Sequence, residues 1–332
     1  MSSVDMAIDL FLVLTLLITV WLLLSSADFL RAAVLFIAFG LFMSLAWVRM
    51  LAPDIALAEA AIGAGITGVL LMDAIRHMEW EKKEWGKRWP KYDRAVVRRN
   101  SLWQRGLPVA AMLALAGLLV AGILQLADQR PGLAELVAEE METLEHPVTA
   151  VLLVFRSLDT WLELGILFLA VLGMLTVRGS QGLAAASLLP LQNPVLESVV
   201  RVLTPLAVLY AAYLIWLGTF TAGGAFQSGV VLGATGILLW LSGHASIDAL
   251  PKWAWKSLVI LGLILFTITA AVTALLPEGM FHYPAALKHA WISILEIAAA
   301  VSIGACFTVL FIGLHPSRGA FASAADSNKE DG

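Results

Sequence analysis

Acidic side chains within long apolar segments are the groups in this sequence best able to do chemistry. They are Asp54, Glu59, Asp159, Glu163 and Glu296. A charge is costly in hydrocarbon and is normally kept there only where it faces a protein interior or a water-filled path. Because carboxylates in such places bind and release protons or cations, these residues are candidates for an ion path. They would then form part of a route for ions through the membrane.

Three charged residues follow one helical stripe. Arg156, Asp159 and Glu163 are spaced i, i+3 and i+7, so one helix presents a cation and two carboxylates on the same side. This spacing resembles an ion relay. The alternative is a buried pair in which Arg156 is the structural charge partner of Asp159 and fixes helix packing, which leaves Glu163 in need of another partner.

The depth of the carboxylates gives a further expectation. Glu59, Glu163 and Glu296 lie about 8 to 10 Å from the expected outer ends of their segments, at 1.5 Å per helical residue. Three helices would then supply acids to one hydrated half-channel. Asp54 lies about 140° around a helix from Glu59 and directly follows Pro53, so capping of its own helix is an alternative role.

The elements that carry these residues are expected to be membrane-spanning helices. Of the 332 residues, 60% are apolar and 14% are charged, whereas about 25% are charged in an ordinary soluble domain. Apolar runs of about 20 residues without strand alternation indicate helices that cross hydrocarbon. About nine are expected, at residues 6–24, 30–49, 52–74, 107–126, 158–177, 199–217, 225–242, 257–276 and 290–313. The predicted fold class is an all-α integral membrane protein with a retained first span.

The distribution of basic residues predicts the orientation of the chain. Residues 76–105 hold ten of the 21 lysines and arginines, so this loop should be cytoplasmic. Residues 128–146 carry six acids and one arginine and should lie outside. The amino terminus is then outside and the carboxyl terminus cytoplasmic, in a multi-pass protein of the cell (inner) membrane with lipids around it. The tryptophans of the basic loop fit an interfacial anchor, so no nucleic acid partner is expected.

No cofactor or metal site is expected. Cys306 is the one cysteine, which excludes CxxC metal and haem sites. The stretch GAGITG at 63–68 has the letters of a dinucleotide fingerprint but lacks the preceding strand, and its glycines are better explained by close helix packing. All lysines are expected in loops or in the tail. A lysine relay across the membrane would therefore need partner subunits.

Four sequence stretches resemble a known family. APDIALAEAAIGAGITGVLL at 52–71 and FRSLDTWLELGILFLAVLG at 155–173 resemble the carboxyl-terminal region of the large A subunit of Mrp-type multisubunit sodium/proton antiporters. That region is also similar to two small subunits of energy-converting hydrogenases, here termed MbhD-like and MbhE-like. From about 193 onward, NPVLESVVRVLTPLAVLYAAYLIWLG and GGAFQSGVVLGATGILL resemble the separate, MnhB-like B subunit.

The resemblance implies a fusion. Its regions are a three-helix MbhD-like region with the basic loop at 1–105, a two-helix MbhE-like region with the acidic outer loop at 106–180, a four-helix MnhB-like region at 181–317 and a polar tail at 318–332. It implies a complex related to the membrane arm of respiratory complex I, with other antiporter subunits, including large antiporter-like ones, as partners. Glu59, Asp159 and Glu163 match acidic positions of the family.

The sequence departs from the family at two places. B subunits usually have a glycine–histidine pair followed by a proline and three glycines, whereas here Thr219 follows Gly218 and an Ala-Gly-Gly-Ala run stands at 222–225. We expect Gly223, Gly224 and Gly229 to keep the bend of this helix turn. Ala58 replaces a hydroxyl residue before Glu59, which bears on the choice of ion.

The leading hypothesis is a membrane subunit of a monovalent cation (Na⁺)/proton antiporter. It would supply an acidic ion path and contacts with sister subunits, with Na⁺ and H⁺ as the transported ions. One alternative is a membrane-arm subunit of an ion-translocating oxidoreductase whose redox cofactors sit on other chains. The other is a purely structural scaffold, in which the acids are packing elements.

Overall fold

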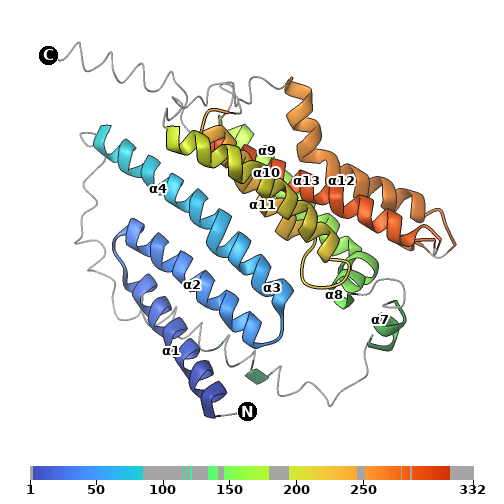
Figure 1. The fold of residues 1–332 in the computed structure, drawn as a ribbon, viewed down its shortest axis with the longest axis horizontal. Helices are drawn as coiled ribbons and strands as arrows, with labels where there is room; N and C mark the ends of the chain where they lie inside the picture. The colour runs from blue at the N-terminus through green and yellow to red at the C-terminus, as the bar shows by residue number, and fades with distance from the viewer. Residues whose placement is uncertain are drawn as a thin grey trace. The chain divides into compact units, whose positions relative to one another are not determined.

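A computed structural model describes residues 3–84, 114, 117, 120–121, 134–140, 146–178, 194–244, 251–277, 279–284 and 286–314. Every regular element within these residues is helical (Figure 1). The elements are α1 (Ser3–Ser25), α2 (Phe29–Arg49), α3 (Pro53–Ala58), η1 (Glu59–Ile66), α4 (Thr67–Glu84), α7 (Ala134–Glu140), α8 (Pro147–Ala150), η2 (Val151–Phe155), α9 (Ser157–Arg178), α10 (Pro194–Leu217), α11 (Ala225–Leu241), α12 (Lys252–Thr273) and α13 (Lys288–Leu314).

Within the described residues, seven helices are long and apolar enough to cross a membrane. They correspond to seven of the expected spans, and α11 is an eighth apolar helix of 17 residues, shorter than the roughly 20 that a full crossing needs. The expected span at 107–126 lies largely outside the described residues. The all-helical membrane fold is thus confirmed for the described part of the chain.

One expected helix is interrupted by a π-helical turn, and another is preceded by one. The third span consists of α3, η1 and α4, and Glu59 is the first residue of η1. A second π turn, η2, precedes α9, and the Arg156 N–H closes it with a hydrogen bond of 2.8 Å to Val151 O. π turns inside helices are uncommon and often accompany functional sites. Both lie next to charged residues that the sequence singled out.

The chain divides into two compact units, residues 1–77 with 140–332, and residues 78–139. Within the first unit α13 is the central helix, since 67% of its most apolar stretch is buried, compared with 11% in α1 and in α2. It packs against α9, α11 and α12. Polar side chains reinforce this packing, because Ser302 Oγ donates to Val259 O of α12 at 2.6 Å.

Glycines bring α11 and α13 together. A Cβ added at Gly229 would lie 2.7 Å from the Ile303 side chain and 3.0 Å from Ala300 O, and one added at Gly304 would lie 2.8 Å from Leu232 Cβ. Gly229, which we expect to help keep the bend before this helix, lies inside α11, more than a turn from Gly224. Its role is close helix approach, as small residues have in membrane helices generally.

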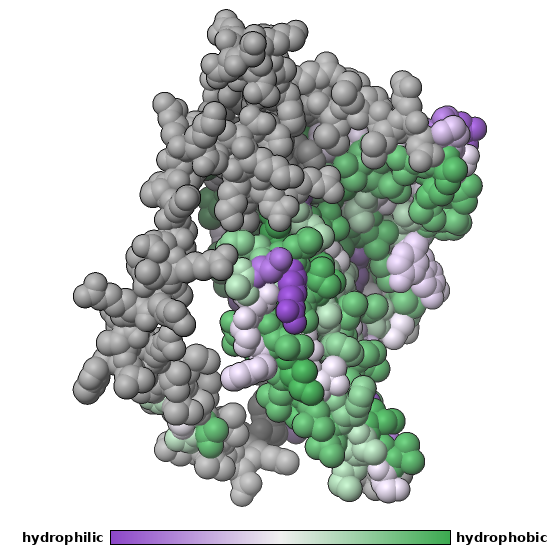
Figure 2. All heavy atoms as spheres, turned by 90° about the vertical axis from the view of Figure 1, so that its left-hand side faces the viewer, coloured by the Kyte–Doolittle hydropathy of each residue, from purple (hydrophilic) through white to green (hydrophobic). Residues whose placement is uncertain are grey.

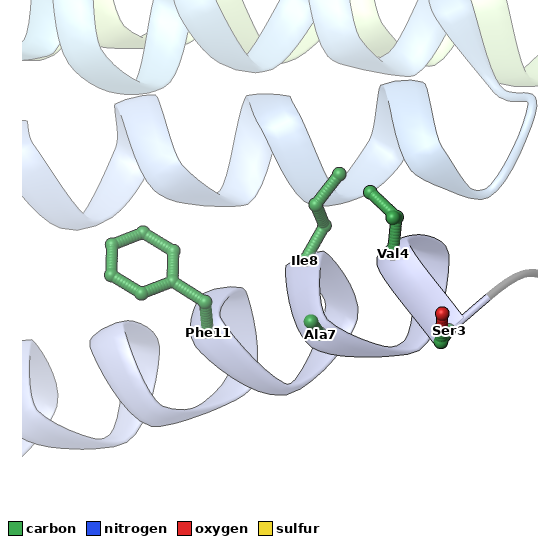
Figure 3. Close-up of a pocket in the computed structure, with 5 residues that line it drawn as sticks. All are labelled: Ser3, Val4, Ala7, Ile8 and Phe11. Carbon is green, nitrogen blue, oxygen red and sulfur yellow. The ribbon is translucent and has the colours of Figure 1, made fainter.

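The outward faces of several helices are strongly apolar. Large hydrophobic side chains are exposed along α1, α2 and α10, among them Phe11, Trp21 and Trp216. Figure 2 shows one face on which most of the described residues are apolar. A hollow beside the first turns of α1 is lined by apolar side chains such as Val4, Ile8 and Phe11, with no titratable group (Figure 3). These faces suit contact with lipid or with other chains.

Gly229→Ala should destabilise the protein by about 1–3 kcal/mol, because the added methyl group overpacks the α11–α13 contact. The measurement is the thermal unfolding midpoint in mild detergent. Gly173→Ala on α9 is the matched control, since no atom of another part of the described chain lies within 4 Å of its added Cβ. An equal midpoint for both variants would contradict the importance of this contact.

Candidate functional site

The clearest polar site of the described chain surrounds the turn between α10 and α11. Asp54, in the first turn of α3, accepts a hydrogen bond of 3.2 Å from the Gly223 N–H through Oδ1. Its other oxygen, Oδ2, lies 3.5 Å from His146 Nε2, and the side chains of Asp54 and His146 are both only 12% exposed. No side-chain hydrogen bond caps α3. The alternative role of Asp54 as a cap of its own helix is therefore wrong, and its carboxylate instead contacts a turn 169 residues away.

The turn itself needs glycine. A Cβ at Gly218 would lie 2.7 Å from Gly224 N, and one at Gly223 would lie 2.6 Å from Leu214 O. Gly224 has φ +116°, a conformation that other residues rarely adopt. The Thr149 hydroxyl donates to Gly218 O at 2.6 Å and ties the turn to α8. The absence of side chains in this turn lets the Gly223 N–H reach the Asp54 carboxylate.

Two further side chains complete the site. Gln227 Nε2 donates to the backbone carbonyl of Asp54 at 3.3 Å. Glu296 lies on α13, is 5% exposed, and places Oε1 3.5 Å from the position of a Cβ on Gly224. We call Asp54, His146, Gly223, Gly224, Gln227 and Glu296 the turn cluster. Its members come from α3, the residue before α8, the turn, α11 and α13.

Glu59 has separate surroundings. Its Oε1 lies 3.3 Å from the position of a Cβ on Gly40 of α2, and a Cβ on Gly63 would overlap the carboxylate. A Cβ on Gly68 would lie 2.8 Å from Ile37 of α2. The glycines of the GAGITG stretch thus make room for the Glu59 carboxylate and for α2, which agrees with the close-packing interpretation of this motif.

The stripe on α9 lies at the surface of the chain. Arg156 Nε donates to Asp159 Oδ2 at 2.5 Å, but the two side chains are 65% and 43% exposed. The alternative that this pair is buried is therefore wrong for the described chain, because Arg156 sits at the bend between η2 and α9. Glu163, one turn further along α9, is also exposed. An exposed ion pair of this kind typically contributes only about 0.2–1 kcal/mol to the stability of a protein.

The structure therefore brings some predicted residues together and separates others. Asp54 and Glu296 meet in the turn cluster, whereas Glu59 lies between α2 and η1 and Glu163 on the exposed face of α9. Sequence reasoning missed His146 and Gln227. The signals were weak: a histidine before the proline that starts α8, and a glutamine after the Ala-Gly-Gly-Ala run.

Two findings concern cations. Lys256 lies in the second turn of α12, with Nζ 5.7 Å from the centre of the Trp255 ring, and Lys288 is the first residue of α13. The expectation that all lysines lie in loops or in the tail is thus wrong for these two. It is also wrong for Lys82 and Lys83 at the end of α4 and for Lys252, the first residue of α12, although all five are near helix ends. Among the described residues no group of three histidine, cysteine or acidic side chains could hold a metal ion.

The fold and the site define a multi-pass, all-helical membrane protein with buried carboxylates. Within it, residues 14–79 match the family model MbhD, which describes a subunit of MBH, and residues 195–314 match the model "Domain related to MnhB subunit of Na+/H+ antiporter". These segments fall in the regions that resemble MbhD and MnhB. The resemblance to Mrp-type subunits is thereby confirmed for both segments.

The fold is shared with a chain of a solved complex, "Structure of Mrp complex from Dietzia sp. DQ12-45-1b". The TM-score is 0.67 at 19% identity over 93% of this chain. The present chain spans 35% of the length of that chain. Comparison with curated proteins gave no significant match.

Asp54→Ala should lower the stability of the protein by about 1–3 kcal/mol, because the Gly223 N–H loses its acceptor in a partly buried place. Asp54→Asn should retain most of the stability, since the amide oxygen can still accept that bond. Thermal unfolding in detergent measures both. The control is Glu197→Ala on α10, which removes an exposed pair with Arg201 at 2.9 Å. If Asp54→Ala unfolds like this control, the turn does not depend on the carboxylate.

Proposed function

We propose that this chain is a membrane subunit of a multisubunit Na⁺/H⁺ antiporter. The observation that carries the proposal is that one helical chain contains both an MbhD segment and a segment related to the MnhB subunit of a Na⁺/H⁺ antiporter. The fold shared with a chain of an Mrp complex supports it. The chain would act as a part of a transporter rather than as an enzyme.

The proposal includes an arrangement in the cell (inner) membrane. Nine spans would place the amino terminus outside, the basic loop at 76–105 inside, and the carboxyl terminus inside. Residues 106–180 would form the MbhE-like region between the two matched segments. Asp5 and Asp9 at the start of α1 pair with Arg49 at the end of α2, as neighbouring ends on one side of a membrane would require.

The acids would have different tasks within the complex. Glu296 is buried within this chain and Glu59 and the other polar side chains of the turn cluster are partly buried, so they suit an internal ion path. Asp159 and Glu163 are exposed on α9; Asp159 is paired with Arg156, whereas the charge of Glu163 has no ion pair among the described residues and would be costly against lipid. We infer that another subunit covers this face and continues the path there. Large antiporter-like subunits are the partners that the family resemblance implies.

Purification of the complex in mild detergent tests the assignment. We expect co-purifying antiporter-like chains and Na⁺-dependent proton movement after reconstitution, detected with a pH-sensitive dye in vesicles. The isolated chain should show no exchange, because the subunit that would cover Glu163 on α9 and continue the path is missing. Robust exchange by the isolated chain would contradict the subunit assignment.

A second candidate is a membrane-arm subunit of an ion-translocating oxidoreductase, and the MbhD match favours it. The same purification separates the two functions. Co-purifying chains that carry redox cofactors would support the second candidate, whereas large antiporter-like subunits without them support the first.

Glu163→Gln should abolish or strongly reduce ion exchange by the complex while leaving its assembly intact. Glutamine keeps the shape of the side chain but carries no charge, and Glu163 makes no hydrogen bond or ion pair with any residue that the structure describes. Exchange rates across a range of pH and size-exclusion profiles are the measurements. Glu197→Gln on α10 is the control. Wild-type exchange in an assembled Glu163→Gln complex would show that this carboxylate only packs.

A further inference from the structure

The space beside Gly224 is bordered by oxygen atoms. At the position of a Cβ on Gly224, two heavy atoms of the described residues lie within 4 Å once Gly224 and its chain neighbours are set aside. They are Glu296 Oε1 at 3.5 Å and Gln227 Oε1 at 3.6 Å. One is a carboxylate oxygen and the other an amide oxygen. When Glu296 is ionised, neither oxygen can donate a hydrogen bond, and both can only accept one. A proton donor or a cation is the group that such a pair requires.

The orientation of Gln227 is fixed by chemistry. The Asp54 carbonyl can only accept a hydrogen bond, so the amide atom that bonds to it at 3.3 Å must be Nε2. The amide oxygen is thereby turned toward Gly224. Asp54 is held in turn by Gly223 and His146. The amide oxygen is therefore positioned before any ligand arrives.

Glu296 brings a charge that has no compensation within the described chain. It is 5% exposed, and its neighbours on α13 include the buried Leu295, Ala299 and Ala300. No hydrogen bond or ion pair joins it to another described residue. A buried, unpaired carboxylate is strongly unfavourable unless a proton or a cation neutralises it.

We propose that Glu296 and Gln227 form a binding site for a small monovalent cation in the space beside Gly224. One carboxylate supplies a single negative charge, which a monovalent ion balances, and hard oxygen ligands favour alkali ions over transition metals. When no cation is bound, a protonated Glu296 would instead donate a hydrogen bond to Gln227 Oε1. The same place would then hold either a cation or a proton, which is what an exchanger needs.

The proposal rests on the proposed function for the identity of the ion, Na⁺. The site needs the backbone at Gly224 as it is, because any side chain there would enter the space between the two oxygens. His146 and Asp54 are the other titratable groups of the turn cluster, and they act on the site through Gln227.

The test measures Na⁺ binding separately from transport. The thermal midpoint of the purified complex is recorded in NaCl and in N-methylglucamine chloride of equal ionic strength. We expect Na⁺ to raise the midpoint of the wild type. Glu296→Gln and Gln227→Met should each lose this rise and increase the Na⁺ concentration for half-maximal exchange by about tenfold or more, since even the loss of an outer-shell partner weakens metal sites by about that factor. Glu197→Gln should behave like the wild type.

The outcomes distinguish the site from the proposed function. If the complex exchanges ions and both variants keep the Na⁺-dependent midpoint and the wild-type half-maximal concentration, Glu296 is simply protonated and the site is wrong. If the Na⁺-dependent midpoint is lost in the variants but no complex exchanges ions, the site stands and the antiporter assignment fails. Should Glu296→Gln not assemble, Gln227→Met decides by the same two measurements.

Discussion

The hydrogen bond between the Gly223 N–H and the Asp54 carboxylate joins the amino-terminal helices to the carboxyl-terminal ones. It needs a turn in which Gly218, Gly223 and Gly224 have no side chains, because each added Cβ would collide with backbone or adopt a disfavoured conformation. It also fixes the Asp54 backbone carbonyl, to which Gln227 binds. The arrangement of the polar interior around Glu296 thus depends on one carboxylate and one backbone amide.

This contact lies between the two matched family segments. Asp54 is within the MbhD match, and Gly223, Gln227 and Glu296 are within the match related to MnhB. His146 comes from the chain between them and contacts the same carboxylate. Residues of both segments are therefore needed to form the polar site. It exists because the helices of both segments meet at one turn.

Much of the fold could be predicted from the sequence, because membrane helices are indicated by the length and hydropathy of each segment alone. The position of Glu59 beside close-packed glycines also follows from the small residues around it. The surroundings of the other acids could not be predicted. Whether Asp54 caps α3 or contacts a turn far along the chain depends on tertiary packing, and the exposure of Arg156 depends on the π turn before α9. Gln227 carries no charge and follows no spacing rule, so only its hydrogen bond to Asp54 reveals it.

The presence of both family segments in one polypeptide changes how their contact forms. Two separate chains would find each other at a rate and to an extent set by the amount of each in the membrane. Segments on one chain meet at an effective concentration set by the connecting residues, which does not depend on expression level. A weak contact, such as the single hydrogen bond of 3.2 Å from Gly223 to Asp54, can then stay formed without a large interface. The fusion thereby also fixes a one-to-one ratio of the two segments.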